Sequence, residues 1–215
     1  LQLEPESFSP LQVSTWYISA DNSDGTDFPK LLAKLRQSGI LSSANKTDWN
    51  KRIYQSETGE LTLDTNRLTM NVVTPRLEGA ILKRGQSAVL PALSVRNVSV
   101  PASVTAASLN ADQTLKNASR ILLTVATNAF NSNMTFENAS LFCCVNPGEL
   151  PVLMESIQCR IELATTHGKK PKVYALHLDG TRFAELPCSM ENGRLILALD
   201  TSKLKNGTPF FEIVY

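Results

Sequence analysis

The stretch Arg120-Ile-Leu-Leu-Thr-Val-Ala-Thr-Asn-Ala-Phe-Asn-Ser-Asn-Met134 joins the longest apolar strand pattern of the chain to a loop rich in asparagine. Successive side chains of a strand point to opposite faces, and residues 120–129 carry Ile, Leu and Val on both of them. Strands that are apolar on both faces lie in the interior of a sheet. The run therefore predicts a central strand that is followed by an irregular segment.

Shorter β-rich runs surround this strand from about residue 52 to the C-terminus. They recur about every 8 to 12 residues between turn residues, as in all-β sandwiches. The pattern predicts a β-sandwich of mainly antiparallel strands. Besides the central strand, strands are expected at 60–64, 68–73, 79–83, 87–90, 93–100, 103–109, 140–145, 152–155, 156–163, 172–178, 181–185, 194–199 and 210–215.

The C-terminal third contains two turn dipeptides, Asp179-Gly180 and Asn192-Gly193, which supply the positive φ angles of tight hairpins at little steric cost. Apolar residues alternate with polar ones over 157–163, and Leu195, Leu197 and Leu199 share one face of their strand. This alternation indicates a sheet with one side on the core, and we expect the C-terminal strands to form a meander.

One helix is expected, near residues 28–38. Asp27 is suited to be its N-cap, Pro29 lies in the first turn and Gly39 is a typical C-terminal stop. We therefore divide the chain into an N-terminal linker and helical segment, residues 1–51, and a β-sandwich domain, residues 52–215.

The bulk composition excludes some classes of partner. The 215 residues carry 21 Lys and Arg against 20 Asp and Glu, so the net charge is +1 and no strong field attracts nucleic acid. No apolar run approaches the roughly 20 residues that span a bilayer, so membrane insertion is not expected. The N-terminus shows no signal-peptide pattern, and we expect a fragment or a mature form.

Four cysteines lie at 143, 144, 159 and 188. The adjacent pair Cys143-Cys144 fits neither a usual disulfide framework nor the spacing of a metal site. We expect mostly free, buried thiols, with a Cys159–Cys188 disulfide as the alternative. Neither a metal nor a cofactor is expected.

Catalytic motifs are not found in the sequence. The two histidines, His167 and His177, lie outside any nucleophile motif; we expect His167 to be exposed in a turn and His177 to lie on an outer strand face. A glycosidase needs two carboxylates that face each other across the bond it cleaves. Six glutamates could supply such a pair, but we expect them to lie at solvated surface positions instead. The candidates are Glu57, Glu60, Glu78, Glu137, Glu155 and Glu212.

Four aromatic residues in the N-terminal quarter could form a flat platform for sugar rings: Trp16, Tyr17, Trp49 and Tyr54. The same residues could instead pack their segment on a core or on a neighbouring domain. The platform is the candidate carbohydrate-binding site.

A set of motifs resembles the C-terminal β-sandwich region of bacterial glycoside hydrolases of β-galactosidase-like and cellulase-like type. The order and spacing of the motifs agree over about residues 52 to 215. The motifs are Ser56-Glu-Thr-Gly-Glu-Leu61, Val73-Thr-Pro-Arg-Leu-Glu-Gly-Ala80, Arg120-Ile-Leu-Leu-Thr-Val125 with Asn131-Ser-Asn-Met134, Leu150-Pro-Val-Leu153, Tyr174-Ala-Leu-His-Leu-Asp-Gly-Thr-Arg182 and Phe211-Glu-Ile-Val214. The chain departs from the family at Glu57, Val73 and Asn133, where the family has Asp, Asp and Gly.

The resemblance implies a noncatalytic accessory domain of a carbohydrate-active enzyme, extracellular, periplasmic or on the cell surface. Such enzymes carry this region behind a (β/α)-barrel catalytic domain, so the catalytic glutamates are expected upstream of Leu1 and the chain alone is not expected to be an enzyme. The implied partner is a covalently linked or adjacent catalytic domain, with a polysaccharide as the second expected partner. The alternatives are a free carbohydrate-binding module, marked by an exposed aromatic platform, and a surface adhesin or structural domain with protein partners only. An exposed apolar patch would favour the accessory domain.

Overall fold

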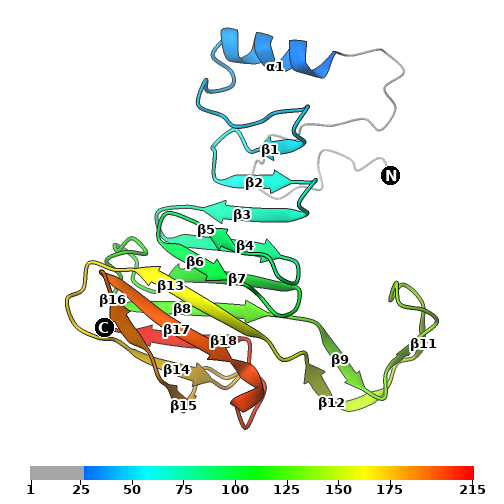
Figure 1. Ribbon diagram of the computed structural model, residues 1–215, viewed down its shortest axis with the longest axis vertical. Coiled ribbons are helices and arrows are strands. Elements are labelled where there is room, and N and C mark those ends of the chain that lie inside the picture. The colour runs from blue at the N-terminus through cyan, green and yellow to red at the C-terminus, as the bar shows by residue number, and fades with distance from the viewer. Residues whose placement is uncertain (1–26) are drawn as a thin grey trace. The chain divides into compact units, whose positions relative to one another are not determined.

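A computed structural model describes residues 27–215 and divides the chain into two compact units (Figure 1). The first unit ends at Asn71, and the second runs from Val72 to Tyr215. The division after residue 51 stays a prediction. No helix within the described residues is long and apolar enough to cross a bilayer.

The first unit contains the expected helix, α1 (Phe28–Gln37). Asp27 caps it by accepting a hydrogen bond from the Lys30 backbone N–H at 3.2 Å, and the chain leaves the helix through Gly39 at φ +73°. An antiparallel hairpin follows, made of β1 (Ile53–Gln55) and β2 (Leu61–Asp64). The helix prediction is thus confirmed, with boundaries within one residue.

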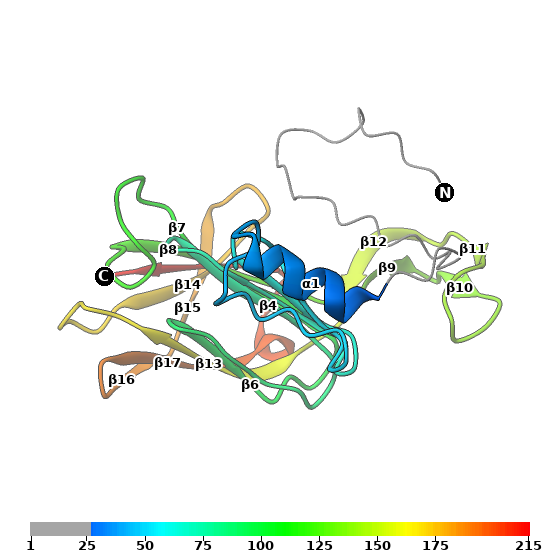
Figure 2. The same ribbon diagram turned by 90° about the horizontal axis from the view of Figure 1, so that it is seen from above.

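The second unit is a sandwich of two antiparallel sheets, whose layers are seen edge-on in Figure 2. Within this unit the first sheet has the order β4-β7-β8-β18-β14-β15, and the second has the order β16-β17-β13-β6-β5. The strands from residue 69 onward are β3 (Thr69–Val73), β4 (Leu77–Leu82), β5 (Ala88–Val89), β6 (Leu93–Arg96), β7 (Ala102–Ser108), β8 (Arg120–Ala126), β9 (Ala129–Ser132), β10 (Thr135–Phe136), β11 (Cys144–Asn146), β12 (Glu149–Met154), β13 (Gln158–Ala164), β14 (Lys172–Leu176), β15 (Arg182–Leu186), β16 (Ser189–Glu191), β17 (Arg194–Asp200) and β18 (Phe210–Val214), with a short 3-10 helix, η2 (Thr201–Lys203), after β17.

The core lies between these two sheets and consists of side chains that alternate inward. On β8 the inward residues Ile121, Leu123 and Val125 are buried, and the strand pairs with β7 on one side and β18 on the other. The prediction of a central strand is therefore confirmed. From the other layer the core receives Ile161 and Leu163 of β13, which are fully buried.

Both predicted hairpins form, but they belong to different layers. The Asp179-Gly180 turn joins β14 to β15 in the first sheet, and the Asn192-Gly193 turn joins β16 to β17 in the second. The chain crosses the sandwich between β15 and β16 and returns between β17 and β18. The predicted meander is wrong because alternation reveals the apolar face of a strand, whereas its sheet is chosen by long-range packing.

Residues 127–156 leave the sandwich and form an extended arm (Figure 1). Its two short ribbons are the antiparallel pair β9–β12 and the antiparallel pair β10–β11. We call residues 127–156 the arm. The stretch before residue 140, which was expected to be irregular, contains β9 and β10, and the strands predicted at 140–145 and 152–155 overlap β11 and β12.

Candidate interaction surface

The base of the arm is held by hydrogen bonds between its two chain ends. The Thr127 hydroxyl donates to the Glu155 carbonyl oxygen at 2.6 Å, and the Glu155 N–H donates to the Asn128 carbonyl oxygen at 2.8 Å. The Asn128 amide also donates to the Glu155 carboxylate at 2.9 Å. These bonds fix where the arm leaves the sandwich.

The Asn-rich loop holds the arm together along its length. The amide of Asn131 donates to the Pro147 carbonyl oxygen at 2.9 Å, and the hydroxyl of Ser132 donates to the Pro151 carbonyl oxygen at 2.7 Å. Asn133 donates to the Glu149 carboxylate at 3.0 Å and has φ +60°. Asn tolerates this left-handed backbone better than most residues.

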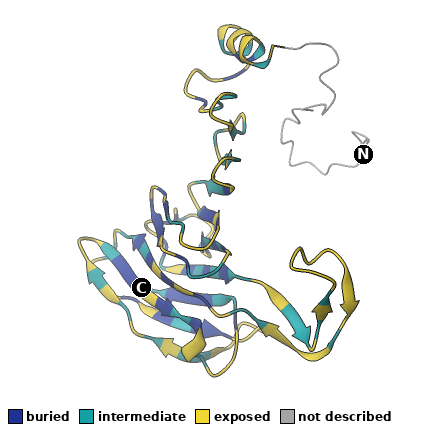
Figure 3. Ribbon diagram, turned by 45° about the vertical axis from the view of Figure 1, so that its right-hand side comes forward, coloured by how far each residue is buried: buried dark blue, intermediate teal, exposed yellow. Residues whose placement is uncertain are grey.

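Most of the arm is exposed (Figure 3), and it carries a concentration of exposed apolar side chains. Six of the ten exposed large hydrophobic residues of the second unit lie on it, and Phe142 is 91% exposed. The six are Leu141, Phe142, Val145, Leu150, Val152 and Leu153. Exposed apolar side chains scattered singly are normal on a soluble protein, but here six of them lie within 13 consecutive positions, 141–153.

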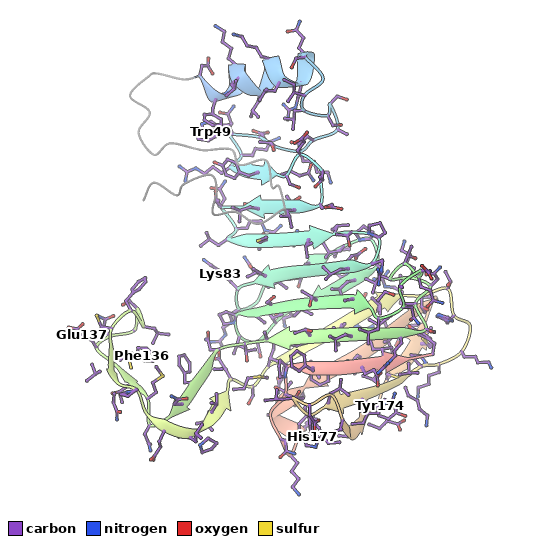
Figure 4. The ribbon with its side chains drawn as sticks, turned by 180° about the vertical axis from the view of Figure 1, so that it is seen from behind. Trp49, Lys83, Phe136, Glu137, Tyr174 and His177 are labelled. Atoms are coloured by element: carbon purple, nitrogen blue, oxygen red, sulfur yellow. The ribbon has the colours of Figure 1, made fainter. Side chains whose placement is uncertain are left out.

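The charged side chains of the arm are all acidic. The arm carries Glu137, Glu149 and Glu155 and no basic residue, and the whole run 121–159 lacks Lys and Arg. Phe136 packs edge-on against Phe130 at 5.7 Å within the arm, and Figure 4 shows Phe136 and Glu137 on it. An acidic, apolar surface best fits a partner surface that is apolar and rimmed by basic groups. This absence of Lys and Arg over 121–159 is visible in the sequence and singles out the segment that forms the arm.

We expect Gly148→Ala to disrupt the arm and leave the sandwich folded. Gly148 has φ +72°, and a Cβ there would meet the Ser132 carbonyl oxygen and come within 2.7 Å of the Met134 backbone nitrogen. Hydrogen exchange followed by mass spectrometry should show faster exchange across 129–154 and unchanged exchange in β8 and β13. Gly85→Ala is the matched control because it has φ +77° and no atom within 4 Å of its Cβ position, so it should cost only about 1 kcal/mol. Unchanged exchange in the arm would contradict this account.

Residues from three of the sequence motifs meet on the outward face of the first sheet. The Glu212 carboxylate on β18 accepts hydrogen bonds from Arg120 on β8 and Arg182 on β15, the second at 2.7 Å from Nε. The Arg182 guanidinium also lies 4.2 Å above the Tyr174 ring, which is labelled in Figure 4. Burial raises the pKa of Glu212, but hydrogen bonds from Arg120 and then from Arg182 outweigh it and hold the pKa below its ordinary value. We call Arg120, Glu212 and Arg182 the arginine–glutamate cluster.

The motif at residues 73–80 is also engaged in structural contacts. The Glu78 carboxylate on β4 is 4% exposed and accepts hydrogen bonds from the backbone N–H groups of Ala92 and Leu93 at 2.8 and 2.7 Å. It thereby ties the first sheet to the start of β6 in the second. A Cβ on Gly79 would lie 2.5 Å from the Thr105 methyl carbon, so the strands can approach only with glycine there. Both residues stabilise the sandwich.

Two of the four candidate sugar-binding aromatics lie together in the first unit. The Trp49 ring stacks on Phe28 with centroids 4.4 Å apart, and it forms a T-shaped pair with the Tyr54 ring at a centroid distance of 5.9 Å. One face of the indole is therefore covered by the helix. Trp16 and Tyr17 lie outside the described residues, and the carbohydrate-binding role stays a prediction.

The histidines are engaged in packing contacts. His167 is half-buried, in contrast to the exposed position predicted, because its ring stacks on Tyr215 at 4.4 Å and its Nε2 lies 3.1 Å from the carbonyl oxygens of Asn117 and Ala118. His177 is exposed beside the Phe183 ring.

The carboxylates and thiols differ in part from their predicted surroundings. Glu78 and Glu212 are buried by the contacts described above, whereas surface positions were predicted for the glutamates. All four cysteines are free, but Cys143 and Cys144 are exposed on the arm, so the prediction of mostly buried thiols fails for that pair. Within residues 27–215 no group of three or more His, Cys, Asp or Glu side chains is placed to hold a metal ion.

Comparison of the chain with models of protein families, with curated proteins and with solved structures finds no match.

Proposed function

We propose that this chain is a noncatalytic accessory β-sandwich domain of a bacterial glycoside hydrolase, secreted or held at the cell surface, and that it packs on the catalytic domain through the arm. The carrying observation is the concentration of exposed apolar side chains on the arm. Burying such side chains contributes about 1.5 to 3 kcal/mol each when a partner covers them fully. The motif resemblance supplies the identity of the proposed partner, a (β/α)-barrel.

The contacts of the motif residues support a noncatalytic role. A retaining or inverting glycosidase needs two carboxylates that face each other across an open cleft. Glu78 and Glu212, the two buried candidates, instead have their oxygens occupied by backbone N–H groups and by guanidinium groups. Their carboxylates serve packing between strands and sheets.

The docking prediction can be tested with a separately produced barrel domain from a bacterial glycoside hydrolase whose own C-terminal region carries the same motif set. We expect the chain to form a complex with it in sedimentation velocity. The double variant Phe142→Ser/Val152→Ser should weaken the complex at least about 100-fold, because two apolar contacts of about 1.5 kcal/mol or more each are lost. Val89→Ser is the matched control: Val89 is 65% exposed on β5, outside the arm, and its loss should leave binding unchanged.

A sugar titration separates this proposal from the free carbohydrate-binding module. Both tryptophans lie in residues 1–71, so intrinsic fluorescence reports on the predicted aromatic platform. Soluble β-glucans, galactans and host-type glycans should leave the fluorescence unchanged. A saturable shift that Trp49→Ala or Trp16→Ala removes, together with no barrel complex, would overturn the accessory-domain proposal in favour of a binding module.

A further inference from the structure

Two adjacent thiols lie open to solvent on the outer part of the arm. Cys143 lies in a bend, and Cys144 opens β11; both are exposed. The Cys144 thiol donates only to the carbonyl oxygen of Asn146 two residues on, at 3.2 Å. Reagents in solution can therefore reach both sulfur atoms.

The other two cysteines, Cys159 and Cys188, are shielded from reagents in solution. Cys159 is 8% exposed in the sandwich core, and burial raises its pKa to about 12. Cys188 is half-buried and donates to the Pro171 carbonyl oxygen at 3.4 Å, and burial raises its pKa as well. Since the thiolate is the reactive form, neither side chain competes for an oxidant.

We propose that Cys143 and Cys144 form a thiol–disulfide redox site that closes to a vicinal disulfide with a small disulfide, such as oxidised glutathione, as the oxidant. One cysteine thiolate attacks a glutathione sulfur, which forms a mixed disulfide and releases one glutathione thiolate. The second cysteine thiolate then attacks the protein sulfur of the mixed disulfide and expels the other glutathione. The two cysteine sulfurs lose two electrons in total, glutathione disulfide accepts them, and the two protons go to the released thiolates.

Adjacency in the chain favours the closing step. The second attack is intramolecular, so the local thiol concentration exceeds that of dissolved glutathione. Adjacent side chains of a regular strand point to opposite faces, which would oppose closure. Here the β10–β11 ladder has a register shift between Thr135 and Phe136, and Cys143 lies outside the strand. Closure requires the Cys143-Cys144 peptide to rotate, which breaks the hydrogen bond that the Cys143 carbonyl oxygen accepts from the Glu137 backbone N–H at 3.0 Å. Because the disulfide is exposed, it should be readily reduced, as is typical of labile disulfides.

The test is incubation of the folded chain with oxidised glutathione, followed by intact-mass measurement. The wild type should lose about 2 Da and lose its two iodoacetamide-reactive thiols, and dithiothreitol should restore both. Cys143→Ser and Cys144→Ser should each instead gain about 305 Da, because the mixed disulfide has no neighbouring thiol to resolve it.

Cys188→Ser is the control variant and should behave like the wild type, because its thiol is half-buried. The inference is overturned if the wild type keeps free thiols, accumulates the same glutathione adducts as the single variants, or forms disulfide-linked dimers. The experiment needs no barrel domain, so its result is independent of the docking proposal.

Discussion

Glu78→Ala is expected to lower the free energy of unfolding of the sandwich by about 3 kcal/mol. The carboxylate is buried and is the acceptor for the N–H groups of Ala92 and Leu93. Removing it leaves two donors inside the protein without a partner, and each such group costs about 1 to 3 kcal/mol. Urea unfolding followed by far-UV circular dichroism measures the effect, since the second unit contains no tryptophan.

Two further variants at glutamate positions sharpen this test. Glu78→Gln retains one oxygen that can accept both N–H groups, so it should lose only the extra strength of a charged acceptor, about 1 kcal/mol. Glu137→Ala removes an exposed carboxylate of the arm and should change the unfolding free energy by less than about 0.5 kcal/mol. If Glu78→Ala were as mild as Glu137→Ala, the tie between the sheets would be energetically unimportant.

Glu212→Gln is expected to lower the free energy of unfolding at pH 7 by about 2 kcal/mol, because hydrogen bonds to two guanidinium groups are weakened at a carboxylate that is 2% exposed. The arginine side chains are 59% and 46% exposed, so water can solvate them in the variant and limits the loss. The amide of glutamine also directs a donor group at an arginine. Urea unfolding at several pH values measures both the size of the effect and its pH dependence.

The pH dependence of this difference has a definite sign. The pKa of Glu212 is lowered in the folded protein, so its contribution is fully present above the ordinary carboxyl pKa of about 4.3 and is lost as the pH falls through the lower folded value. The stability gap between wild type and Glu212→Gln should therefore be largest near neutral pH and shrink below about pH 4. A gap that stays constant to about pH 3 would show that packing, rather than charge, carries the contribution of Glu212.

These two glutamates join segments that lie far apart in the chain. Glu78 links two sheets, and Glu212 links the strands that carry Arg120 and Arg182. Such residues are needed by the fold itself. The proposed function therefore depends on the arm, whose exposed apolar side chains have no comparable role inside the sandwich.

Local sequence signals predicted the elements whose formation depends on neighbouring residues. The N-cap Asp27 and Gly39 delimit α1, and the Asn192-Gly193 turn adopts positive φ at both residues, as expected for a tight hairpin. The alternation of β13 and the apolar run of β8 identified side chains that lie in the core. Each of these signals depends on a few neighbouring residues, so it can be recognised in the sequence without knowledge of the tertiary structure.

Tertiary structure alone decided which strands meet and which apolar residues stay uncovered. Arg120, Arg182 and Glu212 come together because β8, β18, β14 and β15 are neighbours in one sheet, a pairing that no local pattern specifies. Val152 and Leu153 read as an ordinary strand, yet their ribbon leaves the sandwich and exposes them. The period of a strand states which side chains share a face, whereas burial of that face depends on contacts between residues distant in sequence.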